Sequence, residues 1–210
     1  MSFSSERPMP FDTANIVLFS LAALVLLGSP GPGIAALISV GRTKGLVGGL
    51  RFYGGLQVGL AAAAAISAAG LFSAIQAVPF AARGLTIVAT GYLLYLAWKI
   101  ASAPVGEAGE TKTSGFAETG LGGALLGVTN PKAYIAFASL MAAYPIARDR
   151  QPLDLSIKWL ICVVVMVVVD LAWLWLGVVV GKARMTPRAE RAMNLVMGGL
   201  ILATAVLALV

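Results

Sequence analysis

Residues 16–40 read IVLFSLAALVLLGSPGPGIAALISV, an apolar run interrupted near its middle by Ser29-Pro30-Gly31-Pro32-Gly33. A helix needs about 20 mostly apolar residues to cross the hydrocarbon core of a bilayer. Proline removes a backbone donor and clashes with the preceding turn, so we expect the helix to kink or unwind here and to free carbonyl groups. Such backbone is tolerated at membrane depth only where it faces protein or a water-filled cavity. This stretch therefore predicts a broken membrane-spanning helix.

The composition extends this prediction to the whole chain. Of its 210 residues, 59% are hydrophobic and 11% are charged, with a mean hydropathy of +0.91. Ordinary soluble domains carry about 25% charged residues, and a soluble fold of this size would leave large apolar patches exposed. We expect an all-α polytopic membrane protein in which six helices span the bilayer, at residues 16–40, 46–72, 82–101, 119–143, 155–181 and 192–210.

A second interruption, Asn130-Pro131-Lys132, lies near the middle of the fourth predicted span, 101 residues after Pro30 when counted to Pro131. Each break opens a block of three spans, and an odd number of spans turns the second block upside down. Many secondary transporters are built this way, with the binding site at the midplane between broken helices. A single break of this kind often only kinks a helix, but two at matching depths favour a substrate-binding or gating role.

The predicted organisation is one membrane domain, residues 1–210, made of two inverted halves. The first half covers residues 16–101, and the second covers residues 119–210. Residues 102–118 are polar, charged and contain glycine, so we interpret them as a linker between the halves. The half-helices at each break would present backbone N–H groups and a positive dipole end to a carboxylate.

Polar side chains inside the predicted spans are further candidates for the site. Lys132 lies in the fourth span and Asp170 in the fifth. Charges at this depth are costly, and they usually mark pathways, proton relays or ion pairs. Asp170 is the only carboxylate within a predicted span, so we assign it a proton-coupling role; a buried bridge to Lys132 that only fixes helix packing is the alternative. Gln57 and Asn194 are secondary candidates, because such residues more often form interhelical hydrogen bonds.

The basic residues predict how the chain is oriented in the membrane. The loops and span ends on the side of the two termini contain five: Arg7, Arg83, Arg148, Arg150 and Lys158. The opposite side contains nine: Arg42, Lys44, Arg51, Lys99, Lys112, Lys182, Arg184, Arg188 and Arg191. The side richer in Lys and Arg faces the cytoplasm. We therefore expect extracytoplasmic termini in a multi-pass protein of the plasma membrane.

Several partners and chemistries are disfavoured by the same sequence. The net charge of +6 is spread between apolar runs without a continuous basic face, which disfavours nucleic-acid binding. With one cysteine, Cys162, and no histidine, we expect no metal site, cofactor or redox relay. We assign no catalytic residue, although Ser29 and Lys132 leave open an intramembrane enzyme, and a structural membrane protein is a further alternative. Three GxxxG spacings favour close helix packing, within the chain or in a homodimer: Gly55/Gly59, Gly123/Gly127 and Gly177/Gly181.

Four motifs in order along the chain resemble the LysE/RhtB family of amino-acid exporters. They are Pro30-Gly31-Pro32, GRTKGLVGGL at residues 41–50, GYLLYLAWK at residues 91–99 and Asn130-Pro131-Lys132-Ala133. The aromatic residues of the third motif, Tyr92, Tyr95 and Trp98, we interpret as an anchor at the membrane interface.

The resemblance implies efflux of amino acids or related small zwitterions across the bacterial inner membrane, driven by proton exchange. It implies substrate-binding or gating roles for Pro30, Gly31, Pro32, Asn130, Pro131 and Lys132, and a role for Asp170. The family commonly has a polar residue, often Asn, after the PGP element, whereas this chain has Gly33. A substrate contact from that position is therefore not expected here.

Overall fold

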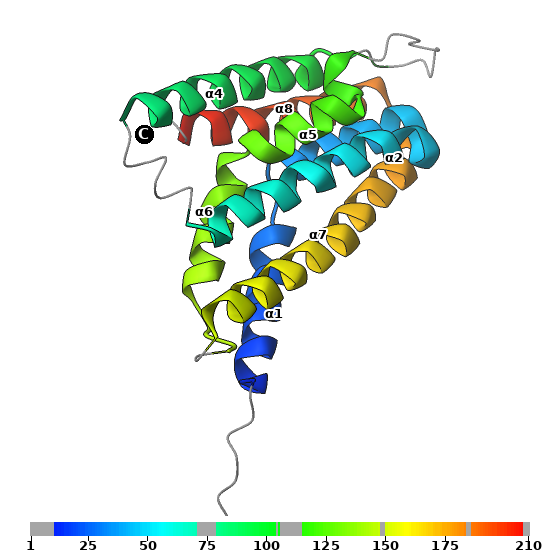
Figure 1. The fold of residues 1–210 in the computed structure, drawn as a ribbon. Helices are drawn as coiled ribbons and strands as arrows, with labels where there is room; N and C mark the ends of the chain where they lie inside the picture. The colour runs from blue at the N-terminus through cyan, green and yellow to red at the C-terminus, as the bar shows by residue number, and fades with distance from the viewer. Residues whose placement is uncertain are drawn as a thin grey trace, which may run out of the picture.

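The computed structural model describes residues 11–70, 79–103, 105, 115–147, 150–183 and 186–207. Within these ranges every regular element is helical: α1 (Thr13–Gly28), α2 (Pro32–Ala68), α4 (Pro79–Ala101), the 3₁₀ turn η1 (Phe116–Glu118), α5 (Gly120–Thr129), α6 (Pro131–Ala142), α7 (Gln151–Lys182) and α8 (Pro187–Leu207) (Figure 1). The all-α prediction is confirmed for this part of the chain. Outside it lie most of the predicted linker and the basic residues Arg7, Lys112, Arg148 and Arg184, and the side chain of Arg83 is not described either.

Both predicted interruptions end one helix and begin the next. α1 ends at Gly28 and α2 begins at Pro32, so that the pair is bent by 61°. α5 ends at Thr129, and α6 begins at Pro131. Proline suits the first position of a helix, because the N–H that it lacks would have no partner there. The structural equivalent of Pro131 is therefore Pro32, and Pro30 lies in the connection before it.

α2 consists of two helical segments joined by a kink at Gly45. This glycine has φ +69°, a left-handed conformation that side-chain-bearing residues rarely adopt. Every residue from Gly31 to Ile38 is buried. A helix that is buried on all sides belongs to the interior of a bundle. The beginning of the first segment of α2, residues 32–38, therefore lies at the centre of the molecule.

Glycines let the backbones of neighbouring helices touch. α2 packs against α5 and α7, and α4 packs against α8 (Figure 1). A Cβ added to Gly123 would lie 2.9 Å from the backbone nitrogen of Leu56, and one added to Gly177 would lie 2.8 Å from the Cα of Ile38. Gly55 and Gly59 meet the backbone of α5 in the same way. All three predicted GxxxG pairs thus make contacts inside the chain, and the homodimer stays a prediction.

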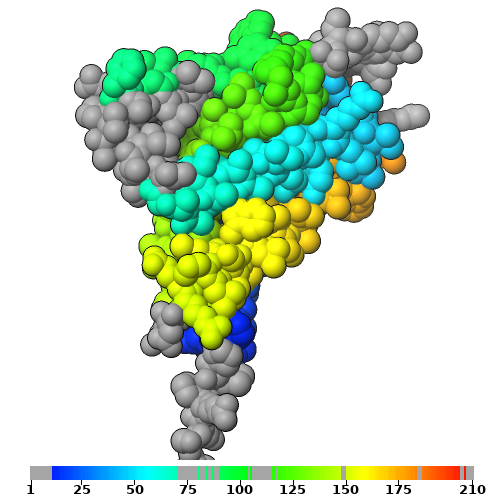
Figure 2. All heavy atoms as spheres, viewed as in Figure 1, coloured from blue at the N-terminus to red at the C-terminus, as the bar shows by residue number. Residues whose placement is uncertain are grey.

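α7 buries a single narrow stripe of side chains and leaves apolar side chains on its other faces. The stripe repeats every three or four residues and comprises Asp154, Lys158, Cys162, Met166, Asp170, Leu174 and Gly177. Figure 2 shows α7 lying along α2 on one face of the molecule. In the described residues, α7 is the one helix long and apolar enough to cross a membrane alone, and the bent pair α1–α2 would make a second span. The plan of six spans in two inverted repeats stays a prediction.

Candidate functional site

Lys132 connects the two helix breaks. From the first turn of α6 its ammonium group donates hydrogen bonds to the carbonyl oxygens of Ser29 and Pro30, the latter at 3.1 Å from Nζ. These carbonyls follow the end of α1, where a helix leaves acceptors without partners and where its dipole favours a cation. The lysine of the second break therefore caps the helix that ends at the first.

Gly31 makes room for this lysine. A Cβ at Gly31 would lie 2.7 Å from the Cδ and 3.2 Å from the Nζ of Lys132. The backbone at Gly31 is extended, with φ −174°, so any residue could adopt its conformation. Space rather than backbone freedom favours glycine at this position, because a methyl group here would push the end of the lysine side chain aside.

A cavity of about 40 Å³ lies between the breaks. Its lining comes from α1, α2, α6, α7 and the two connections, and includes Leu26, Ser29, Gly31, Gly33, Leu60, Asn130, Lys132, Phe137, Met166 and Asp170. Four of the predicted site residues therefore line the same cavity: Gly31, Asn130, Lys132 and Asp170. The three prolines, Pro30, Pro32 and Pro131, are not part of the lining; they define the backbone on which it is built.

Asp170 reaches this cavity from the buried stripe of α7. Its side chain belongs to a residue that is 5% exposed, and its Oδ2 accepts a hydrogen bond of 2.8 Å from the Nε2 of Gln57 on α2. Lys132 bonds to backbone carbonyls, and no ion pair joins it to Asp170 among those of the described residues. Lys132 and Asp170 thus line the same cavity without forming the buried bridge that was the alternative in the sequence analysis.

Two buried amide oxygens beside the charges lack hydrogen-bond partners within the described structure, the Oδ1 of Asn130 and the Oε1 of Gln57. Asn130 precedes the first residue of α6 but makes no side-chain cap to it. Buried polar atoms are nearly always hydrogen-bonded, and leaving one unsatisfied costs about 1–3 kcal/mol. An unsatisfied acceptor in the cavity wall can be compensated by a donor that enters the cavity.

The cavity also collects the N-terminal ends of two helices. Gly33 and Ile34 line it from the first turn of α2, and Lys132 and Ala133 line it from the first turn of α6. First-turn N–H groups have few intrahelical partners and form the positive end of the helix dipole. This arrangement favours an anionic group at the helix starts.

Asn194 lies apart from this cavity. It is 2% exposed; its Oδ1 accepts a hydrogen bond from Arg42, and its Nδ2 donates one of 3.2 Å to the carbonyl of Ala103. It therefore connects α8 with the first segment of α2 and with the chain after α4. The structure places Gln57 beside the candidate site and Asn194 in an interhelical hydrogen bond.

The sequence reasoning missed a buried ion pair at the start of α7. Asp154 and Lys158 lie 2.8 Å apart, and Lys158 is only 3% exposed in its side chain. Asp154 also accepts hydrogen bonds from the backbone of Ile146 and Ala147, and Lys158 donates to the carbonyl of Met141. The spacing of four residues between opposite charges on one helix was the available signal. In the sequence, Lys158 counts among the basic residues of the loops and span ends, whereas in the structure it pairs with Asp154 inside the protein.

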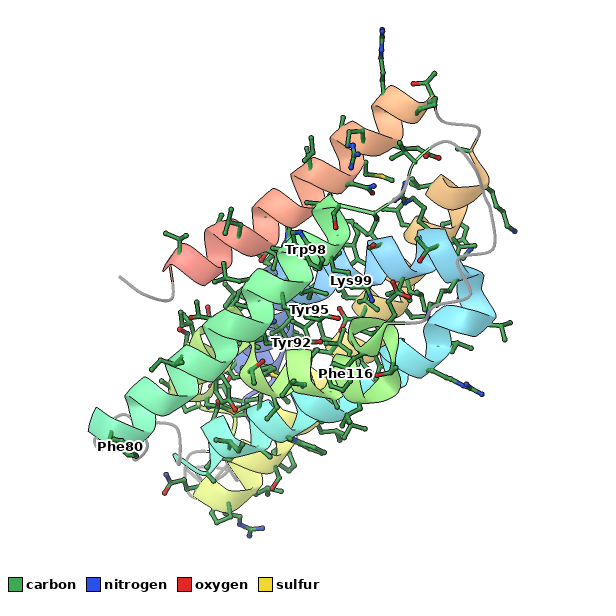
Figure 3. All side chains as sticks on the ribbon, turned by 90° about the horizontal axis from the view of Figure 1, so that it is seen from above. Phe80, Tyr92, Tyr95, Trp98, Lys99 and Phe116 are labelled. Carbon is green, nitrogen blue, oxygen red and sulfur yellow. The ribbon has the colours of Figure 1, made fainter. Side chains whose placement is uncertain are left out.

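At the opposite end of α7, several predicted cytoplasmic charges gather. Glu118 of η1 pairs with Lys44 at 2.9 Å and with Lys99 at 3.8 Å. Figure 3 shows Lys99 and Phe116 of η1 near each other beside the end of α4. Arg191 donates to the carbonyl of Ala101 close by. Among the described residues, Lys158 of the first predicted charge set thus lies near the start of α7, and Lys44, Lys99 and Arg191 of the second set lie near its other end.

Tyr92 behaves differently from the predicted aromatic anchor. It is 8% exposed, and its hydroxyl donates a hydrogen bond of 2.7 Å to the carbonyl of Gly122 on α5 (Figure 3). Trp98, two turns further along α4, is 68% exposed. Tyr92 therefore packs α4 onto α5, and Trp98 remains on the surface, where an anchor would lie.

Apolar helices that are broken at a cavity lined by Lys132 and Asp170 are typical of membrane transporters. The family model described as LysE type translocator matches residues 24–210, and the chain belongs to this family. Membership makes the protein a membrane transporter for small molecules and agrees with the LysE/RhtB resemblance of its motifs. Neither the curated proteins nor the solved structures contain a match to this chain.

Proposed function

We propose that the protein is a secondary transporter that exports amino acids or related small zwitterionic metabolites across the bacterial inner membrane in exchange for protons. The observation that carries the proposal is the convergence of two helix starts, one ammonium group and one carboxyl group on one partly open cavity. A zwitterion presents the complementary pair of charges. At the site, the helix starts, Lys132 and Asp170 would replace the water that the charged groups of the solute lose on binding.

The carboxylate of the solute binds at the first turns of α2 and α6. Gly33 and Ile34 of the first turn of α2 line the cavity there, and Lys132 supplies a full positive charge. Together they offer the donors and the dipole that anions find at helix N-termini. Pro30, Pro32 and Pro131 act indirectly, because they break the helices and so place both starts at this depth.

Asp170 couples transport to protons. Its carboxylate either takes a proton or binds the ammonium group of the solute, with the unsatisfied Oδ1 of Asn130 as a second acceptor. The two ligands exclude each other at one carboxylate, so one leaves when the other arrives. Gln57 donates to the charged form of Asp170 and thereby holds the carboxylate in place.

Alternating access requires the walls of the cavity to move. The cavity of about 40 Å³ has room for water, which needs about 10–15 Å³ by the same measure, and it must enlarge to pass an amino acid. The two inverted halves would rock around the breaks, as in other transporters with this plan. The contacts of α2 with α5, of α7 with α1 and α2, and of α4 with α8 pair helices across the halves and support this arrangement.

The membrane orientation follows from the gathered charges. Lys44, Lys99, Arg42 and Arg191 lie together at one end of the molecule, and we place that end in the cytoplasm. The start of α1 and the connection from α6 to α7 then face the outside, held together by a hydrogen bond from the backbone of Asp12 to Ile146. Both termini of a six-span protein would be extracytoplasmic.

The alternative of an intramembrane hydrolase receives no support from the geometry of its two candidate residues. The hydroxyl of Ser29 donates to the carbonyl of Leu26 at 2.9 Å, and Lys132 bonds to the backbone of Ser29. A nucleophile and base need a hydrogen bond between their own reactive atoms. A purely structural protein would have no use for two charges in a cavity at such cost.

Uptake of labelled amino acids into inside-out vesicles tests the proposal. A proton gradient should drive uptake of at least one solute in the unaltered protein, and Asp170→Asn should abolish it because the exchange site cannot release a proton. Asp12→Asn is the matched control, since Asp12 caps α1 far from the cavity and asparagine is an equally good N-cap. Coupled uptake that survives Asp170→Asn would refute proton exchange at this residue.

A further inference from the structure

The charges of the candidate site are already matched by the backbone groups of an amino acid. Among the residues that line the cavity, Lys132 and Asp170 are the only charged ones. In the function proposed above, Lys132 takes the carboxylate and Asp170 takes the ammonium group or a proton. No further charge in the lining could neutralise a charged side chain on the solute.

The remaining lining is almost entirely apolar. Leu26, Leu60, Phe137 and Met166 come from four different helices, α1, α2, α6 and α7, and face the same cavity. Phe137 is fully buried, and Leu60 and Met166 are nearly so. An aliphatic side chain gains free energy by leaving water for such a wall, whereas a charged one loses its hydration without a compensating counter-charge.

We propose that the transported solute is an amino acid with an uncharged aliphatic side chain, an inference that rests on the proposed function. A charged side chain without a partner in this wall costs about as much free energy as a charged residue at the centre of a membrane helix. This cost corresponds to a preference of about fiftyfold for uncharged over charged amino acids. Basic and acidic amino acids are therefore excluded by the absence of a compensating group, although their backbone groups fit the site equally well.

The test uses the purified full-length protein in liposomes with an imposed proton gradient. Radiolabelled valine, lysine and glutamate are the probes. Valine uptake should exceed that of lysine and of glutamate by about fiftyfold. Lysine or glutamate uptake at a rate close to that of valine would overturn the inference and leave the exporter function standing. Absence of transport for all three, and for a wider panel of amino acids, would remove the proposed function and the inference with it.

A variant with a charge in the wall tests the same point in the opposite direction. Leu60 lines the cavity from α2, so Leu60→Asp should supply the missing negative charge and raise lysine uptake relative to valine by about tenfold or more. Leu60→Asn has nearly the same shape without the charge, and it should not favour lysine. Equal lysine uptake in both variants would contradict the charge argument. If Leu60→Asp does not fold, the comparison of valine, lysine and glutamate still decides.

Discussion

At the scale of single residues, the two breaks meet through Gly31 and Lys132. Lys132 donates hydrogen bonds to the carbonyl oxygens of Ser29 and Pro30, and Gly31 provides the space in which the lysine side chain lies. Hydrogen bonds to charged groups contribute about 1.5–3 kcal/mol each. This small cluster therefore both holds the two breaks together and places a positive charge at the cavity.

Gly31→Ala tests that arrangement. The added methyl group would lie 2.7 Å from the Cδ of Lys132, so we expect it to displace the ammonium group from the Ser29 and Pro30 carbonyls. Transport should fall by about tenfold, with a loss of stability of about 1–3 kcal/mol, measured by vesicle uptake and by thermal unfolding in detergent.

Gly54→Ala is the matched control for this substitution. Gly54 lies in the second segment of α2, and a Cβ there would meet nothing within 4 Å. Alanine has the higher helix propensity, so this variant should transport normally and unfold at an equal or higher temperature. If the two variants behave alike, the lysine is not held in the way described here.

Several residues that line the candidate cavity could be predicted from the sequence, but their hydrogen-bond partners could not. Proline, asparagine and charge within an apolar run are visible locally, and they led to Asn130, Lys132 and Asp170. The sequence could not say whether Lys132 meets Asp170 or a carbonyl, because that choice depends on the rotation of α6 and α7 about their axes. For the same reason, the sequence could not distinguish Gln57, which lies beside the cavity, from Asn194, which joins helices elsewhere.

At the scale of elements, α7 combines an exposed apolar surface with one buried stripe that includes three charged residues. The stripe begins with the ion pair of Asp154 and Lys158, which fixes the connection from α6. It continues to Asp170 at the cavity and ends in Gly177 against the first segment of α2. One helix thus connects the outer end of the molecule, the site and the central half-helix.

The ion pair at the start of α7 predicts a specific pattern of stabilities. Asp154→Asn should lower stability by about 3–5 kcal/mol, because it leaves the buried Lys158 without its counter-charge. The double variant Asp154→Asn, Lys158→Met removes the uncompensated charge and should recover part of this loss. Thermal unfolding of the single and double variants in detergent provides the measurement. Fully additive losses would show that the two residues are not coupled.

The ends of the helices were predictable where proline marks them. Pro32 and Pro131 begin α2 and α6, and Pro79 and Pro187 begin α4 and α8. The kink at Gly45 was not predicted. The sequence indicated two separate spans, residues 16–40 and 46–72, with a short connection between them, whereas α2 continues through the kink. Glycine and neighbouring basic residues are compatible with a loop between two helices and with a kink within one helix. The packing of α2 between α5 and α7 favours the kinked form.

At the scale of the whole molecule, the two ends of α7 belong to two chemically different surfaces. One end gathers Lys44, Lys99 and Glu118, and the other contains the start of α1 and the Asp154–Lys158 pair. Attraction of basic residues to the anionic cytoplasmic leaflet orients membrane proteins. The position of each surface relative to the membrane is therefore open to direct measurement.

Single cysteines tested with a membrane-impermeant maleimide would establish the orientation. The native Cys162 is fully buried and should stay unlabelled. We expect Thr13→Cys, at the exposed start of α1, to react in intact spheroplasts, and Val47→Cys, 84% exposed next to the Gly45 kink, to react only after permeabilisation. The reverse pattern would place the termini in the cytoplasm.

The sequence by itself determined the class of the protein, its helical content and the positions of both breaks. Hydropathy and proline act on the segments that contain them, so their consequences are local. Only the tertiary structure decided that the breaks at Gly31 and Asn130 share a cavity, that Lys132 caps the end of α1, and that Asp170 meets Gln57. Those contacts join residues about a hundred positions apart, and the rotation and depth of packed helices, which no single segment encodes, bring them together.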